Sequence, residues 1–114
     1  MKTRAELREI AQFIAEYATR LMGSGVHTSR VVRNSKRLGA ALGVRVMVSA
    51  FQKEMTFSVY DDESREVYSE VADIPPRPIS FELNAELSAL SWEAYDCRLS
   101  LPEIRARYER LITP

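Results

Sequence analysis

Residues 23–43, GSGVHTSRVVRNSKRLGAALG, hold most of the side chains with which this chain could bind or transform a ligand. The segment contains the only histidine, His27, together with hydroxyls and four basic residues, but no acid. Free backbone N–H groups at a helix start can bind phosphate, and a basic helix face can bind nucleic acid, anionic lipid or a small anion. Nucleophilic catalysis instead needs a base beside the nucleophile and a group that orients that base.

The catalytic and metal-binding alternatives have little support in the sequence. The GSG tripeptide does not follow a strand and lacks the GK[ST] of a phosphate loop, so a helix end followed by a helix start explains it. Cys97 is distant from His27, and residues 61–64, DDES, lack the ligand spacing of a calcium loop. Aromatic residues for base stacking are missing near the basic run. We therefore predict no catalytic residue, no metal, no cofactor and no nucleic-acid partner.

A binding role remains for the basic and polar side chains of the segment. Arg30, Arg33 and Arg37 recur at i, i+3 and i+7, so we expect them on one outward side of a helix. Thr28 and Ser35 fall on the inward side, where they either allow close helix packing or line a small polar cavity. The candidate ligand-binding residues are Gly25, His27, Thr28, Arg30, Arg33 and Ser35.

Composition favours a soluble protein of one domain, which we place over residues 1–114. The formal net charge is zero, but acids are missing from residues 18–53 and dominate from residue 54 to residue 74. The single cysteine excludes an intrachain disulfide and favours a reducing compartment. The N-terminus is too charged for a signal peptide, and no apolar run approaches the about 20 residues of a membrane-spanning helix.

The elements that position these residues follow from capping patterns and periodicity. Thr3 and Glu6 have the spacing of a capping box, and apolar residues at helical spacing then predict a helix over about residues 4–22. Ser24 is expected to cap a second helix that ends at Gly43 and packs antiparallel to the first. Its predicted inward stripe is Thr28, Val31, Ser35, Leu38 and Leu42.

After residue 43 the apolar period becomes 2, which predicts strands over 44–51, 55–60 and 65–72, the third at an edge. Prolines exclude regular structure from the link that follows, and Ser80 and the SLPE capping box at 100–103 start two last helices. We therefore predict an α+β fold of order ααβββαα. Two N-terminal helices precede a three-stranded antiparallel meander sheet, which is covered on one face by helices, and two C-terminal helices follow.

Three stretches resemble, in order, the N-terminal cytoplasmic domain of the threonine/serine exporter family. Residues 21–44 resemble its first helix pair, where Gly25, Thr28, Arg30 and Val31 match the most recognisable run. IPPRPIS (74–80) resembles its proline-containing link, and residues 87–111 resemble its last two helices. The positions that carry this last match are Leu90, Ser91, Arg98, Leu99, Ser100, Leu101 and Glu103. The resemblance extends from about residue 7 to residue 112.

The resemblance implies the cytoplasmic domain of a membrane exporter of small amino acids, with a regulatory, gating or assembly role and no enzymatic one. Membrane helices are expected to follow Pro114 in the full-length protein, at the cytoplasmic side of the inner (plasma) membrane. The implied partners are the membrane domain of the same or a partner chain. Anionic lipid headgroups and a small amino acid or dicarboxylate are further candidates, and a homo-oligomer stays open.

Two alternatives come from the same resemblance. A related two-component branch exports a dicarboxylate such as succinate, and a hydrolase-like role has been suggested for the family's soluble domain. The chain departs from the family pattern where such chemistry would reside: many members have glutamate at the position of His27, and another acid near Val32 or Arg33. Many also have T-P-T between the first two strands, where this chain reads SAFQKEM. These departures weaken the hydrolase alternative.

Overall fold

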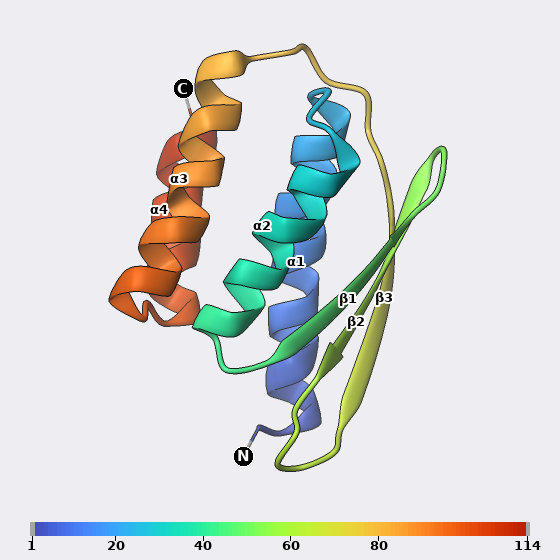
Figure 1. Cartoon of the computed structure of the whole chain (residues 1–114), viewed down its shortest axis with the longest axis vertical. Coiled ribbons are helices and arrows are strands. Elements are labelled where there is room, and N and C mark those ends of the chain that lie inside the picture. Colours follow the sequence, from blue (N-terminus) through green and yellow to red (C-terminus); the bar gives the residue numbers. More distant parts are fainter. Residues whose placement is uncertain (1, 114) are drawn as a thin grey trace.

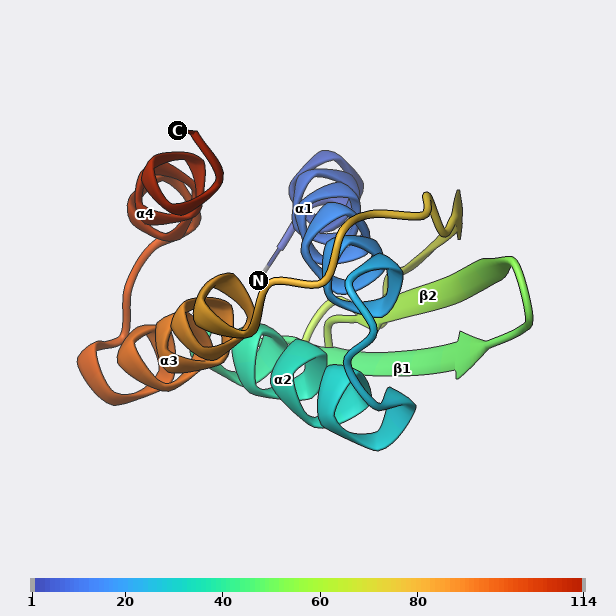
Figure 2. The same ribbon diagram turned by 90° about the horizontal axis from the view of Figure 1, so that it is seen from above.

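The computed structural model describes residues 2–113, which form three stacked layers (Figures 1 and 2). In chain order the elements are α1 (Arg4–Gly23), α2 (Thr28–Ala41), β1 (Arg45–Ala50), β2 (Glu54–Tyr60), β3 (Val67–Asp73), α3 (Phe81–Cys97) and α4 (Leu101–Ile112). Helices α1 and α2 form the middle layer, with the sheet on one side and the α3–α4 pair on the other (Figure 2). The predicted ααβββαα order and the α+β class are confirmed.

Helix α1 is the central element, and it begins with the predicted capping box. The Thr3 hydroxyl accepts a hydrogen bond from the Glu6 backbone N–H, and the Glu6 carboxylate accepts one from the Thr3 backbone N–H. Because α1 lies between two layers, its burial extends beyond one stripe. The buried residues are Leu7, Ile10, Ala11, Phe13, Ile14, Ala15, Tyr17, Ala18, Thr19 and Leu21.

Helix α2 begins later than predicted, and Ser24 is wrong as its N-cap. Ser24 is buried and closes the end of α1, whereas His27 is the N-cap of α2 and accepts a hydrogen bond from the Ser29 backbone N–H at 3.2 Å. The chain first reverses through Gly25, whose φ of 86° lies in the left-handed region, and buries Val26. Thr28 is therefore exposed at the start of the helix, so its predicted inward position is wrong. The other four residues of the predicted inward stripe are buried as expected.

The sheet has the order β1-β2-β3 with both pairs antiparallel, so β3 lies at an edge as predicted. The face toward α1 and α2 holds the buried side chains of Val46, Met55, Phe57 and Val59. The opposite face is half-buried to exposed and includes three charged residues. It is formed by Arg45, Met47, Ser49, Glu54, Thr56, Ser58, Tyr60, Val67, Ser69, Val71 and Asp73. This alternation is the period-2 pattern read from the sequence.

The third layer begins after the proline link, with Ser80 capping α3 and a formed Ser100 capping box starting α4. Helix α4 packs on α1 through an aromatic cluster in which the Phe13 and Tyr108 rings meet edge to face, with centroids 5.3 Å apart. Arg20 donates to the Tyr108 hydroxyl at 2.9 Å. No helix within residues 2–113 is both long and apolar enough to cross a membrane.

Candidate functional site

The six candidate ligand-binding residues do not gather at one point. Three of them build the turn between α1 and α2. Gly25 supplies the left-handed conformation, the His27 ring caps α2, and the Thr28 hydroxyl contacts the Met22 sulfur at 3.8 Å. These three residues therefore have local structural roles in reversing the chain.

The other three candidates lie further along α2 and point in different directions. Ser35 is buried, and its hydroxyl donates to the Val31 carbonyl at 2.8 Å, a bond within the helix. Arg33 is exposed, whereas Arg30 is half-buried and donates through Nε to the Ser88 hydroxyl at 3.1 Å. Of the six, Arg30 alone joins a larger polar cluster, and ligand binding by the set remains a prediction.

A line of hydrogen-bonded side chains, here called the arginine seam, joins α2 to α3. It consists of Arg30, Asn34 and Arg37 on α2, and Ser88 and Ser91 on α3. The Asn34 amide donates to Ser88 at 3.0 Å, and Arg37 donates through Nη1 to the Asn34 amide oxygen at 2.9 Å and to Ser91 at 2.8 Å. The two helices run in the same direction, so residues one turn apart on α2 meet residues one turn apart on α3 (Figure 1).

The prediction that all three arginines point outward is wrong for Arg30 and Arg37. Helix α3 covers their side of α2, and its serines provide the acceptors that make burial of a guanidinium tolerable. The Arg37 guanidinium also stacks on the indole of Trp92, with its central carbon 3.6 Å from the ring centroid. Only Arg33 and the adjacent Lys36 keep the expected exposed position.

The arginine seam has an unusual charge balance. Within residues 2–113 no ion pair joins Arg30 or Arg37 to a carboxylate; the ion pairs are Arg4–Glu66, Arg45–Asp62 and Arg107–Glu93. Neutral hydroxyl and amide oxygens therefore accept the seam's hydrogen bonds. Beneath the seam, burial raises the pKa of Tyr17 far above its ordinary value, and its hydroxyl donates to the Leu87 carbonyl at 2.6 Å. The arginine seam can bind an anion, but it contains no side chain that exchanges a proton near neutral pH.

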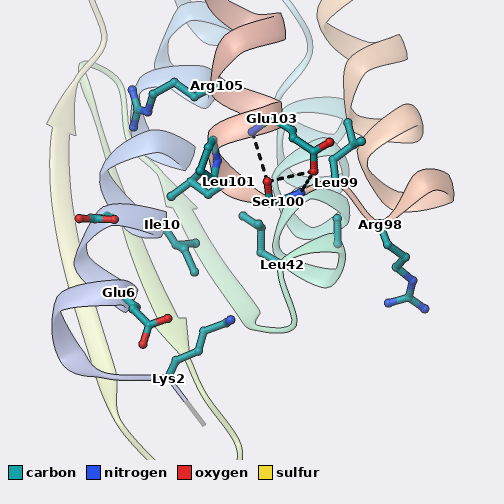
Figure 3. A pocket seen from close by; sticks show the side chains of 13 residues that line it. Lys2, Glu6, Ile10, Leu42, Arg98, Leu99, Ser100, Leu101, Glu103 and Arg105 are labelled. Atoms are coloured by element: carbon teal, nitrogen blue, oxygen red, sulfur yellow. Dashed lines mark hydrogen bonds between the residues drawn. The ribbon is translucent and has the colours of Figure 1, made fainter.

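A groove of about 630 Å³ opens elsewhere, between the start of α1, the end of α2 and the α3–α4 turn (Figure 3). Its apolar side chains come from all of these segments and include Ile10, Leu42, Leu99 and Leu101. Lys2, Arg98 and Arg105 supply positive charge around them, and Glu6, Glu9 and Glu103 supply negative charge. The groove therefore offers an apolar surface with charge of both signs around it.

The capping carboxylates of the groove are occupied by backbone groups. Backbone hydrogen bonds from Thr3 and Ser100 lower the pKa values of Glu6 and Glu103, respectively, below the ordinary glutamate value. Both carboxylates are held ionised by helix starts, which suits structural capping and makes them poor general acids. The arrangement fits the binding of an amphipathic molecule or segment better than proton transfer.

The described residues contain no metal centre, and the hydroxyl that lies beside a base is that of Ser29, 2.9 Å from His27 Nδ1 at an exposed position. That nitrogen also accepts from the Ser29 backbone N–H, and no carboxylate in residues 2–113 hydrogen-bonds to the His27 ring to orient it, so the pair lacks the third group of a catalytic triad. No three His, Cys, Asp or Glu side chains in residues 2–113 come close enough to hold a metal ion. Cys97 is exposed at the end of α3, and its thiol takes part in no hydrogen bond within residues 2–113. The hydroxyls of Thr28 and Ser35 donate to a sulfur and to a backbone carbonyl, respectively.

Sequence reasoning missed the α3 side of the arginine seam. Ser88, Ser91 and Trp92 have the i, i+3, i+4 spacing of one helix face, and Asn34 lies between the two arginines on α2. A polar stripe on each of two helices is a signal that they pack against each other through hydrogen bonds. The sequence contains both stripes, but it does not show which helix each stripe packs against.

The comparison with protein families adds one finding to this geometry. The family model described as "Putative threonine/serine exporter" matches residues 12–113, from the middle of α1 to beyond the end of α4. No curated protein and no solved structure matches the chain.

Proposed function

The chain belongs to the threonine/serine exporter family, and from this we propose that it forms the domain of an amino-acid exporter that lies outside the membrane. The observation that carries the proposal is the extent of the match, which takes in nearly all of a domain closed around its own core. Membrane helices would follow α4 in the full-length protein. We place the domain on the cytoplasmic side of the inner membrane, and its lone exposed cysteine suits a reducing compartment.

We further propose that the domain serves regulation, gating or assembly of the membrane part. Two features favour this over chemistry: the His27 nitrogen beside the Ser29 hydroxyl is used to cap α2, and the groove carboxylates of Glu6 and Glu103 cap helices. The α3–α4 pair, which would connect to the membrane helices, is held to the middle layer by the arginine seam and the aromatic cluster. These contacts are where a movement of the membrane part would reach the rest of the domain.

The exported solute in this proposal is a small amino acid, threonine or serine. A dicarboxylate such as succinate is the alternative within the same class of transporter, and the uncompensated guanidinium groups of Arg30 and Arg37 are compatible with either carboxylate-bearing solute. Both solutes can be measured in one assay, so the alternatives need no separate preparation.

The test is an export assay in bacterial cells that lack their own threonine exporters and express the full-length gene. Cells are loaded with a threonine-containing dipeptide, and threonine, serine and succinate in the medium are measured by chromatography over time. We expect the gene to raise threonine or serine efflux, and Arg37→Gln to reduce it at unchanged protein abundance. Arg33→Gln is the matched control, since it removes the same charge from the exposed side of the same helix.

The outcomes separate the alternatives. Succinate efflux without amino-acid efflux would select the dicarboxylate exporter. Efflux of neither solute from cells in which the protein reaches the membrane would refute the exporter proposal. Hydrolysis of ester, amide or phosphoester substrates by the purified chain, lost on replacing Thr28 or Ser35 by alanine, would restore the hydrolase alternative.

A further inference from the structure

Strand β1 has a free edge on the side away from β2. The Phe51 backbone N–H donates to the Glu54 carbonyl at 2.8 Å, and this bond sets the alternation by which residues 45, 47 and 49 pair with β2. The backbone groups of the intervening residues point away from β2, and no hydrogen bond within residues 2–113 engages them. These residues are Val46, Val48 and Ala50. Free N–H and C=O groups in such a row pair readily with an added strand.

The two edges of the sheet differ in their protection against strand addition. On β3, Glu70 lies on the face toward α1, and an inward charge at an edge opposes pairing with another strand. The Arg4 guanidinium also lies 3.5 Å from the Val67 carbonyl oxygen. By contrast, residues 46–50, VMVSA, contain no charge, proline or glycine, and they pair with β2 without a bulge. The β1 edge is therefore the one that is open to a partner.

Helix α2 packs on β1 and turns this edge into a groove. The two elements approach most closely at Gly39, where a Cβ would overlap the Val46 side chain. Lys36 and Ala40 are exposed on the neighbouring part of the helix surface. Together with the start of β1 they border a groove of about 600 Å³, here called the β1 groove. Its other lining residues are Val44, Arg45, Val46, Met47 and Tyr60.

The position of the helices limits what can pair with β1. Neighbouring strands lie about 4.8 Å apart, whereas packed helices need about 8–10 Å between their axes. In this fold α2 packs on β1, and α1 packs on β3. A second copy with its helices on the same face would therefore bring one of them into α2, whichever edge strand it used. An extended segment that carries no helix on that face has room to bind.

The charge beside the β1 groove favours an acidic segment. Neither α2 nor β1 contains an acid. Arg45 is paired with Asp62 at 3.1 Å, but Lys36 has no ion pair within residues 2–113. Because Lys36 borders the groove, its ammonium group is available to a carboxylate of the bound segment.

We propose that the β1 groove binds an extended acidic segment of a partner protein, which adds to the sheet antiparallel to β1. Alternate residues of the segment exchange backbone hydrogen bonds with Val46, Val48 and Ala50 and direct apolar side chains toward α2. The residues between them carry carboxylates, which Lys36 attracts. This interaction goes beyond the proposed function and does not depend on it, because the purified chain suffices for the test.

The probe is a synthetic peptide, fluorescein-Gly-Gly-Glu-Val-Glu-Val-Glu-Val-amide, whose binding is measured by fluorescence anisotropy. N-methylation of the valine nitrogens removes the donors that face β1, and we expect about tenfold weaker binding. N-methylation of the glutamate nitrogens, which face solvent, is the matched control and should change binding by less than about twofold. Replacing the glutamates by lysine should weaken binding by about tenfold.

Variants of the chain test the same contacts from the other side. Val48→Pro removes the central free N–H of β1 and spares the pairing with β2, so we expect about tenfold weaker peptide binding. Val71→Pro is the matched control, because residue 71 has the same outward position on β3 and should leave binding unchanged. Lys36→Gln should weaken binding about threefold, and Arg33→Gln, which does not border the groove, should not. Circular dichroism checks that each variant is folded.

Amide hydrogen exchange, followed by NMR, locates the peptide on the unaltered chain. We expect the peptide to slow exchange of the Val46, Val48 and Ala50 amides by about tenfold or more, since each gains a hydrogen-bond partner. The Ser69 and Val71 amides on the opposite edge should exchange at the same rate with and without the peptide.

Three outcomes would overturn the proposal. One is the absence of saturable peptide binding, and another is equal loss of binding with the two N-methylated peptides. The third is a dimer of the chain alone that Val48→Pro dissociates in sedimentation measurements, which would assign the β1 edge to a second copy. We expect a monomer.

Discussion

Removal of the Arg37 guanidinium is the sharpest test of the arginine seam. Arg37→Met keeps the aliphatic stem but removes both hydrogen bonds, to Asn34 at 2.9 Å and to Ser91 at 2.8 Å, and the stack on Trp92. At a half-buried position each hydrogen bond contributes about 0.5–1 kcal/mol, and the cation–π contact contributes about 1 kcal/mol. We therefore expect the free energy of unfolding to fall by about 2–3 kcal/mol.

A double-mutant cycle isolates the stack from the hydrogen bonds. Arg37→Met, Trp92→Leu and the double variant are unfolded in urea and followed by circular dichroism, which is appropriate for a small domain that unfolds in one step. The expected coupling energy is about 1 kcal/mol, because the ring is half exposed and water screens the cation. Arg33→Met, which changes the same charge on the solvent side of α2, should alter stability by less than about 0.5 kcal/mol.

The reasoning is refuted if Arg37→Met and Arg33→Met have equal effects. That result would mean that Arg37 contributes only general charge, and that the hydrogen bonds to α3 do not stabilise the fold. If the cycle shows no measurable coupling but Arg37→Met alone has a large effect, the hydrogen bonds stabilise the fold and the stack on Trp92 does not.

Three further predictions follow from the buried hydroxyls, the link and the caps. Burial raises the pKa of Tyr17 and raises that of Tyr108 to about 12, so both phenols stay protonated in the folded state after the unfolded chain has begun to ionise near pH 10. The contribution of each tyrosine to the free energy of unfolding is therefore fully present below about pH 10. Above that pH it falls by about 1.4 kcal/mol per pH unit until the pH reaches the folded pKa of that tyrosine. Urea midpoints measured from pH 8 to pH 11 should show this decline, and Tyr17→Phe should reduce it. Gly23→Ala should destabilise the fold by about 1–3 kcal/mol in the same urea assay, because the new Cβ would overlap the Pro75 carbonyl oxygen; an unchanged midpoint would contradict that close approach. Ser100→Ala removes the side-chain half of the α4 capping box and should cost about 1 kcal/mol, whereas Ser100→Asp should retain most of it.

The fold followed from the sequence because its signals were local. The capping boxes that begin α1 and α4 involve residues three apart, and both were formed as predicted. The alternation of strands β1 to β3 fixed which side chains face the middle layer. The late start of α2 was missed because Ser24 has the right residue type for a cap, and only the burial of Val26 shows that the chain must first turn.

The candidate site was harder to predict because it depends on which helices meet. Arg30 and Arg37 have the spacing of a solvated face, and periodicity alone cannot tell such a face from one that meets serines on another helix. The serines lie more than fifty residues away along the chain, at 88 and 91. The role of polar residues on one helix face can be assigned only when the residues that face them are known.

The three-layer arrangement has a mechanical consequence. The sheet and the α3–α4 pair lie on opposite sides of α1 and α2, and along the chain they are connected by the proline link alone (Figure 2). A pull or twist applied at the far end of α4 would therefore be transmitted to the strands chiefly across the packed bodies of the two central helices. The stiffness of these two helices, and of the tyrosine and arginine contacts that join them to α3 and α4, would decide how much of the displacement reaches the strands.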